Sequence, residues 1–232
     1  MKSYLARPAL ALAVSLALAS CGGGGGKETF PVKVTVSGVQ FPGLVLTTNG
    51  MEVSVPVPAK AGDPVVVTFP NGLDYGTYYD VVPKGGTASS KTGSQPAHQT
   101  CVTAGAPREY GTAGQTASIE SAHTPAIEVF YNCSIKSFPL GGNVTGLTSG
   151  NLTLINGSNG GQITVAGSTT TSPLPFTLPV PVQFGASYGV SVLTQPDGFT
   201  CTVANGTGEM KDAQEAAGGV KDVAVNCTPN TP

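Results

Sequence analysis

The sequence predicts an all-β protein made of two tandem β-sandwich domains, and three observations lead to this prediction. Apolar residues alternate with polar ones along short segments, as they do in half-buried strands. Glycine and proline are abundant, with 32 Gly and 19 Pro among 232 residues. This composition requires many turns and excludes a bundle of long helices. A set of short motifs also occurs twice in the same order, which indicates a duplicated unit.

Residues 1–20 read as an export signal. Lys2 and Arg7 supply a positive start, and the apolar stretch at 9–19 is too short to span a bilayer. The segment ends in Leu18-Ala19-Ser20-Cys21, which resembles the lipobox of bacterial lipoproteins. That resemblance implies cleavage before Cys21 and lipidation of this cysteine. The alternative is an ordinary signal peptide followed by an incidental cysteine.

Residues 21–30 are expected to form a flexible tether between the lipid and the folded chain, because Gly22 to Gly26 have no side chains to pack. In Gram-negative lipoproteins, a residue other than Asp after the lipidated cysteine favours delivery to the outer membrane. By this resemblance Gly22 indicates an outer-membrane protein. Whether the protein faces the periplasm or the cell surface is left open.

The two copies of the unit are expected to form domains at residues 31–135 and 136–232. Each copy begins with Val-Ser/Thr-Gly, continues with Gly-x-x-Tyr-x-Val and Gln-Pro, and closes with Asn-Cys-Ser/Thr. In both copies, the glutamine of Gln-Pro lies six residues before a cysteine that follows threonine. The matching residues are Gly38 and Gly146, Gly76 and Gly185, Gln95 and Gln195, Cys101 and Cys201, and Cys133 and Cys227. The first copy has nine extra residues between Val81 and Gln95, and a polar stretch at 104–125.

Four cysteines remain besides Cys21, and an even number in an exported chain favours disulfides. One pair in each copy selects the bridges Cys101–Cys133 and Cys201–Cys227. Free thiols, or bridges between the copies, are the alternatives. Each closing cysteine is in phase with the apolar residues of its segment, so we expect each bridge inside the core, between the last two strands of its unit.

About seven strands are expected in each copy, which in roughly 100 residues is the range of immunoglobulin-like (Ig-like) sandwiches. The alternating segments include Val34, Leu46, Val55, Val67, Tyr79 and Tyr131 in the first copy, and Val144, Leu154, Val165, Val180, Val192, Cys201 and Val225 in the second. Pro56, Pro58, Pro179 and Pro181 should make their segments edges or irregular, because proline cannot donate to a sheet. Only residues 209–217, followed by two glycines, are expected to form a short helical turn. The Trp of standard immunoglobulin cores is absent, so no strand topology is predicted.

The duplicated unit resembles a repeat of exported lipoproteins and large surface proteins of proteobacteria. Those repeats read Val-Ser-Gly-Leu, Gly-x-x-Tyr-x-Val-x-Val, Gln-Pro-x-x-x-Thr-Cys and Val-x-Cys. The second copy matches them well, and the first departs by its insertion and its polar stretch. The resemblance covers nearly the whole mature chain and implies extracytoplasmic β-domains. The family brings no catalytic residues, so none is assigned.

The charge balance disfavours nucleic-acid binding, because 11 basic against 13 acidic residues leave a net charge of −2 without a basic patch. The sequence also lacks a nucleophile elbow, a zinc-protease motif and a phosphate loop, so neither an enzyme nor a cofactor is predicted. His98 and His123, with Glu109 or Glu120, are the candidates for a metal site or an acid–base pair. The alternative is two solvated loop histidines, since zinc needs three or four converging ligands.

A candidate binding surface combines His98, Arg108, Tyr110 and His123, because loops on a rigid scaffold often carry function. Tyr79 is expected in the core instead, since it aligns with Tyr188. The sequence thus predicts a lipid-anchored, non-catalytic outer-membrane protein that serves as a structural, adhesive or binding module. Its expected partners are the membrane and an envelope protein or glycan. An extracytoplasmic metal-binding protein or enzyme using the His98 and His123 loops, and a carbohydrate-binding module, are the alternatives.

Overall fold

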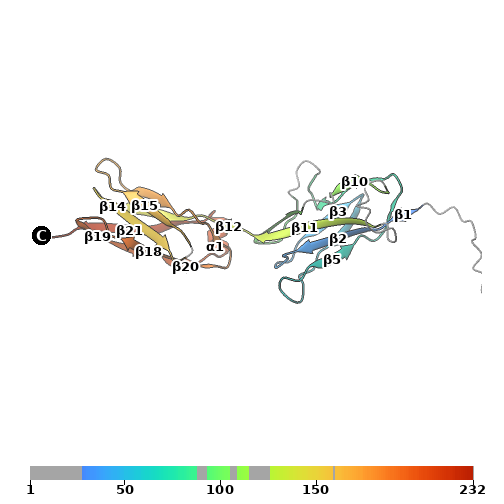
Figure 1. Ribbon diagram of the computed structural model, residues 1–232, viewed down its shortest axis with the longest axis horizontal. Helices are drawn as coiled ribbons and strands as arrows, with labels where there is room; N and C mark the ends of the chain where they lie inside the picture. Colours follow the sequence, from blue (N-terminus) through green and yellow to red (C-terminus); the bar gives the residue numbers. More distant parts are fainter. Residues whose placement is uncertain (1–27, 88–92, 105–108, 115–125, 159, 232) are drawn as a thin grey trace, which may run out of the picture.

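The computed structural model describes residues 28–87, 93–104, 109–114, 126–158 and 160–231. These residues are almost entirely strands and turns, which confirms the predicted all-β class. The strands gather in two bodies that lie end to end along the long axis of the molecule (Figure 1). We call the described part up to Ile135 the first lobe and the part from Ser137 onward the second lobe, with Lys136 between them.

The first lobe begins with a short strand and ends with a long central strand. Its strands are β1 (Thr29–Phe30), β2 (Val32–Ser37), β3 (Val45–Thr48), β4 (Met51–Ser54), β5 (Val65–Thr68), β6 (Leu73–Asp74), β7 (Tyr78–Asp80), β8 (Val82–Pro83), β9 (Gln99–Thr103), β10 (Tyr110–Thr112) and β11 (Ile127–Ile135).

The second lobe has longer strands and a single short helix. Its elements are β12 (Ser137–Phe138), β13 (Leu140–Thr145), β14 (Asn151–Asn156), β15 (Gln162–Ala166), β16 (Leu174–Thr177), β17 (Val182–Gln183), β18 (Ser187–Thr194), β19 (Phe199–Ala204), β20 (Thr207–Glu209), α1 (Asp212–Ala216) and β21 (Val220–Pro229).

The two lobes share one sheet topology, so the repeat in the sequence is also a repeat in the structure. One sheet has the order β5-β2-β11-β9 in the first lobe and β16-β13-β21-β19 in the second. In both, the central pair is parallel and the outer pairs are antiparallel. The opposite sheet has the order β4-β3-β8 in the first lobe and β15-β14-β18-β20 in the second.

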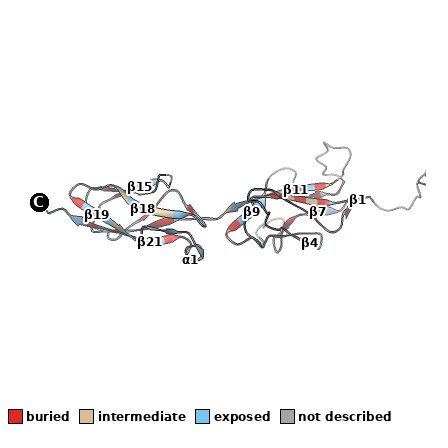
Figure 2. Cartoon of the chain, turned by 90° about the horizontal axis from the view of Figure 1, so that it is seen from below, coloured by how far each residue is buried: buried red, intermediate tan, exposed pale blue. Residues whose placement is uncertain are grey.

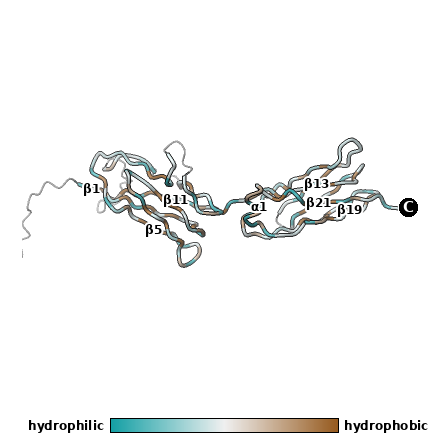
Figure 3. Tube along the Cα trace, turned by 180° about the vertical axis from the view of Figure 1, so that it is seen from behind, coloured by the Kyte–Doolittle hydropathy of each residue, from teal (hydrophilic) through white to brown (hydrophobic). Residues whose placement is uncertain are grey.

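Each lobe has its own hydrophobic core, to which both of its larger sheets contribute buried residues. Val32, Val34 and Val36 on β2 are fully buried, and so are Leu152 and Leu154 on β14. The intervening residues are more exposed, as a period of two requires. Figure 2 shows this alternation of buried and exposed positions along the strands, and Figure 3 shows apolar stretches along the strands of both lobes.

Both predicted disulfides are present. Cys101–Cys133 joins β9 to β11, and Cys201–Cys227 joins β19 to β21. In each pair the two cysteines lie directly opposite each other, so the bridge links neighbouring strands of one sheet. Three of these cysteines are buried in the cores, and Cys133 is partly buried. The bridged strands are not consecutive along the chain, contrary to expectation, because β10 in one lobe and β20 in the other come between them.

The strands are shorter and more numerous than the expected pattern of about seven in each copy. The apolar run from Phe176 to Phe184 is split into β16 and β17 around Pro179 and Pro181, as the missing proline donors require. Pro56 and Pro58 likewise lie in the irregular segment after β4. The first lobe has β7 and β8 where the second has the single strand β18, and its extra residues follow this interruption.

The short helix α1 lies within the predicted range of 209–217 and ends before Gly218 and Gly219. Both glycines have positive φ values, of 68° and 117°, which close the helix and turn the chain into β21. None of the helices among the described residues is long and apolar enough to cross a membrane.

Candidate functional site

The connection between the lobes is one residue long. Strand β11 ends at Ile135 and β12 begins at Ser137, which leaves Lys136 alone between them. The Lys136 backbone N–H donates to the carbonyl of His98 in the first lobe, with an N···O distance of 2.8 Å. Its carbonyl accepts a hydrogen bond from the N–H of Phe184 in the second lobe, at 2.9 Å. The connecting residue is therefore bonded on both sides, and we call this region the joint.

His98 is delivered to the joint by the turn that precedes β9. Its backbone has a φ of 59°, in the left-handed region that few residues other than glycine adopt. The imidazole stacks on the ring of Phe184, with centroids 3.6 Å apart and planes 5° from parallel. Phe41 meets both rings edge to face, at centroid distances of 5.0 Å from His98 and 5.9 Å from Phe184. The three rings thus pack the first lobe against the second.

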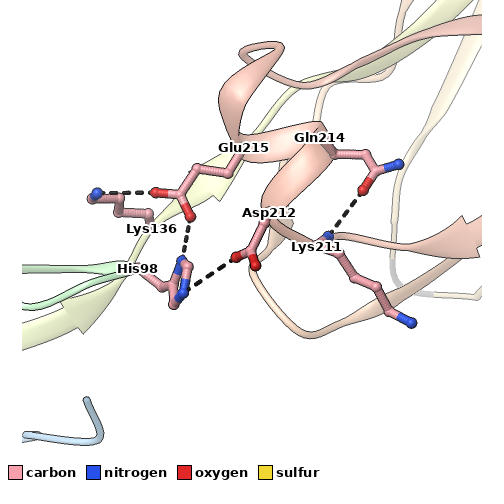
Figure 4. Close-up of polar contacts among 6 residues, drawn as sticks. All are labelled: His98, Lys136, Lys211, Asp212, Gln214 and Glu215. Atoms are coloured by element: carbon pink, nitrogen blue, oxygen red, sulfur yellow. Dashed lines mark hydrogen bonds and ion pairs between the residues drawn. The ribbon is translucent and has the colours of Figure 1, made fainter. Parts of the chain in front are cut away.

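The same imidazole lies between two carboxylates of α1 (Figure 4). Its Nδ1 contacts Oε2 of Glu215, and its Nε2 lies 3.4 Å from Oδ1 of Asp212. The other carboxylate oxygen of Glu215 accepts a hydrogen bond from Nζ of Lys136 at 3.0 Å. Glu215 is the most enclosed member, with 19% of its side chain exposed, and Asp212 is mostly in solvent at 84%.

The environment of Glu215 holds it in its charged form. Burial alone would raise the pKa of this carboxyl group. Hydrogen bonds from His98 and Lys136, together with their positive charges, outweigh burial, and the pKa is lowered from its ordinary value of 4.5. Glu215 is consequently an anion at neutral pH that bonds one residue of the first lobe and the residue between the lobes.

His98, Asp212 and Glu215 are also a group of three potential metal ligands among the described residues, with candidate ligand atoms within 4.8 Å of one another. The arrangement of the three side chains suits a protonated imidazole better than one metal ion bound by all three residues. The two carboxylates face different ring nitrogens, whose lone pairs diverge, so one ion could not replace both contacts without moving a carboxylate. The ammonium group of Lys136 also occupies the second oxygen of Glu215. The set places one carboxylate beside each nitrogen of the His98 ring.

The structure brings only part of the predicted candidate residues to this place. His98 is at the joint, with 21% of its side chain exposed, and not in an open loop. Tyr110 is exposed on β10, which Figure 1 places well away from the joint. Cys21, Arg108, Glu120 and His123 lie outside the described residues, so the proposed lipidation and the pairing of the two histidines are predictions still. Glu109 is buried, and its carbonyl accepts a hydrogen bond from Val81.

Tyr79 differs in burial from its neighbours Tyr75 and Tyr78, as its alignment with Tyr188 indicates. Tyr79 is buried in the first core, whereas Tyr75 and Tyr78 are exposed. The partners of His98, by contrast, carried no signal in the sequence. Glu215 follows His98 by 117 residues, and neither Phe184 nor Lys136 belongs to a motif shared by the two copies.

Comparisons with known proteins add little to this description. No protein-family model matches the chain, and no curated protein matches its sequence. Among solved structures, it is similar to a C-terminal fragment of the pilus adhesin SpaC from Lactobacillus rhamnosus GG. That match has 12% identity and a TM-score of 0.37, and covers 88% of this chain and 99% of the other. A second similarity is to the major pilin T-13 of Streptococcus pyogenes, with 14% identity, a TM-score of 0.26, and coverage of 88% and 98%. Likeness at this level carries no argument about function.

Proposed function

We propose that this protein is a lipid-anchored, non-catalytic protein of the bacterial outer membrane, in which two Ig-like domains form a stiff spacer or adhesive module. In this proposal the domains are residues 31–135 and 136–232, carried on the tether at 21–30. The partners are the membrane, through the anchor, and an envelope protein or glycan. The observation that carries the proposal is the joint, where the single residue Lys136 is bonded to both lobes.

A joint of this kind suits a spacer because it resists bending. Flexible connections between domains are long and rich in glycine and serine. Here the connection is one residue long, its backbone N–H and C=O are both used, and three aromatic rings pack beside it. Strands β12 and β17 also pair directly after the connection.

The positions of the chain ends fit the same role. Strand β1 lies at one end of the elongated molecule, and the C-terminus lies at the other (Figure 1). An anchor at Cys21 would attach the end that carries β1, so the second lobe would stand away from the bilayer. Structural and adhesive proteins use this arrangement to present a surface at a distance, and it needs no catalytic group.

The anchor is tested by metabolic labelling with a fatty-acid analogue in a Gram-negative host. The wild-type chain should take up the label and fractionate with the outer membrane, because durable anchoring requires acyl chains. Cys21→Ser should lose the label and appear in the soluble extracytoplasmic fraction. Ser20→Ala, which keeps a small residue before the cysteine, is the matched control and should behave as wild type. Labelling of the Cys21→Ser chain at the wild-type level would refute the anchor.

Stiffness is tested separately by small-angle X-ray scattering on the mature chain carrying Cys21→Ser. The wild-type joint should give a narrow distribution of distances with the lobes end to end. A flexible Gly-Ser segment inserted between Ile135 and Lys136 should broaden that distribution and shorten the mean separation of the lobes. An equally broad distribution without the insertion would contradict the spacer.

A further inference from the structure

We propose that the joint is a proton-operated clasp, in which doubly protonated His98 ties the first lobe to Asp212 and Glu215 of the second, and loss of one ring proton loosens the lobes. This inference needs neither the lipid anchor nor a partner. It concerns the same joint that carries the proposed function, and the two proposals are distinguished by pH. Lobes that stay aligned at both pH values would keep the stiff spacer and overturn the clasp.

The placement of the two ring nitrogens is the first argument. Nδ1 of His98 faces Glu215 and Nε2 faces Asp212, so each nitrogen meets a different carboxylate (Figure 4). A carboxylate accepts hydrogen bonds, and a neutral imidazole has only one N–H to donate. Only the imidazolium form presents an N–H to each carboxylate, in the hydrogen bond with Glu215 and in the ion pair with Asp212 at 3.4 Å. The neutral form leaves one ring nitrogen lone pair directed at an anionic oxygen.

The balance of charge around the ring is the second argument. The groups that the structure places around His98 are the carboxylates of Asp212 and Glu215 on α1, the ammonium group of Lys136 in the connection, and the uncharged rings of Phe41 and Phe184. With a protonated His98, the two positive charges balance the two carboxylates. After deprotonation one negative charge is in excess, and Glu215, the more enclosed of the two carboxylates, keeps Lys136 as its positively charged partner.

The stack with Phe184 is the third argument. A cation above the face of an aromatic ring is attracted by the negative charge of that face. The imidazole of His98 lies parallel to the Phe184 ring at a centroid distance of 3.6 Å, and the two residues belong to different lobes. Protonation therefore strengthens a second contact across the joint.

Deprotonation should loosen the joint without separating the lobes. The hydrogen bonds from Lys136 to His98 and from Phe184 to Lys136 use backbone groups, and the contact between Lys136 and Glu215 does not involve the ring. These interactions persist when His98 is neutral. The expected change is a wider range of angles between lobes that stay connected.

Residual dipolar couplings of the mature chain carrying Cys21→Ser test this inference. We expect one shared alignment tensor for both lobes at about pH 5, and separate tensors at about pH 8.5, on either side of the range in which histidine ordinarily changes charge. The imidazole ¹⁵N shifts of His98, recorded in the same samples, should show two N–H groups in the aligned state. Equal tensors at both pH values in the wild-type chain would overturn the clasp, and this comparison requires no variant.

Variants locate the effect. His98→Asn keeps a side chain that tolerates the left-handed backbone at this position, and it should give separate tensors at both pH values. Glu215→Gln should lose most of the pH response. Glu209→Gln is the matched control, because Glu209 pairs with Lys211 and is not among the partners of His98; it should respond as the wild type does. A wild-type response in His98→Asn, or lobes held together at about pH 8.5 by added Zn²⁺ bound to His98, would overturn the proposal in favour of another contact or of a metal site.

Discussion

The side-chain amide of Gln195 bonds both backbone groups of Cys201. Its Oε1 accepts a hydrogen bond from the Cys201 N–H at 2.8 Å, and its Nε2 donates to the Cys201 carbonyl at 3.0 Å. Gln95 makes the same two contacts with Cys101 in the first lobe, at 2.7 and 3.3 Å. The spacing of six residues in the Gln-Pro motif is thus the span of a turn that returns the glutamine to the backbone of the bridged cysteine. The glutamine of the motif thus has a structural role in both lobes.

Gln195→Ala should destabilise the second lobe by about 1–2 kcal/mol, because two hydrogen bonds are lost and the backbone of an outer strand is left to solvent. Urea denaturation of the oxidised chain measures this difference. Gln162→Ala, which removes an exposed strand glutamine from β15, is the matched control and should change stability by less than about 0.5 kcal/mol. Equal effects of the two substitutions would show that the amide contacts contribute nothing.

A second motif residue, Gly146, lies against the other bridged cysteine of the second lobe. A Cβ atom at Gly146 would lie 2.0 Å from the carbonyl oxygen of Cys227, and Gly38 has the corresponding position at 2.4 Å from that of Cys133. Gly146→Ala should therefore push the end of β13 away from β21. We expect the free energy of unfolding to fall by about 3 kcal/mol or more, because left-handed backbone strain and overpacking add together.

Gly185→Ala separates these two costs. Gly185 has a φ of 79°, close to the 77° of Gly146, but a Cβ atom there would have no atom within 4 Å. The free energy of unfolding of this variant should fall only by the cost of left-handed backbone strain, about 1–2 kcal/mol. Thermal or urea unfolding measures the stability of both variants. The difference between them is the cost of the steric clash at Gly146. If the two were equally unstable, the close approach of Gly146 to Cys227 would have no energetic role.

The strand pattern and both disulfides could be predicted because they depend on local periodicity and on a repeat. The alternation of Val32, Val34 and Val36 reports a buried face directly, and one cysteine pair in each copy leaves a single symmetrical pairing. The roles of the motif residues were not predictable, since a glutamine bonded to a backbone and one bound to a ligand look alike in sequence. The joint was even harder to predict from the sequence. His98 and Glu215 meet only because two lobes pack end to end, and the second copy has Gly198 at the position of His98, so the repeat gives no signal for this histidine.

Gln99 shows how the first lobe departs from the duplicated plan. It occupies the position of Phe199 in the second copy, and it is completely buried. Its Nε2 donates to the carbonyl of Gly38 at 2.7 Å, and its Oε1 accepts from the N–H groups of Gln40 and Phe41 at 2.8 and 2.9 Å. This one side chain therefore satisfies three backbone groups in the segment that leads to Phe41 and the joint.

Gln99→Leu should destabilise the first lobe by about 2–4 kcal/mol, because an apolar side chain of similar size leaves those backbone groups without partners. Amide hydrogen exchange should accelerate at Gln40 and Phe41 in particular. Gln40→Leu replaces an exposed glutamine next to the same segment, and we expect it to change stability by less than about 0.5 kcal/mol. A stable Gln99→Leu chain with unchanged exchange at these two amides would refute the role of Gln99.

The contact between α1 and the first lobe depends on pH, because Glu215 must be charged to make it. Hydrogen bonds from His98 and Lys136 lower its pKa in the folded chain below the ordinary value of 4.5, although burial opposes them. A carboxyl group with a lowered pKa contributes stability above its unfolded pKa and loses that contribution as the pH falls through the folded value.

The difference in unfolding free energy between the wild type and Glu215→Gln should thus be about 1–2 kcal/mol at neutral pH, as for hydrogen bonds to a charged group. It should shrink steadily in urea titrations as the pH falls below about 4.5, because the folded chain then takes up the proton that the unfolded chain already holds. Glu209→Gln removes an exposed ion pair with Lys211 instead, and its effect should stay below about 0.5 kcal/mol throughout. A Glu215→Gln difference that did not change with pH would mean that the charge of Glu215 does not stabilise the joint.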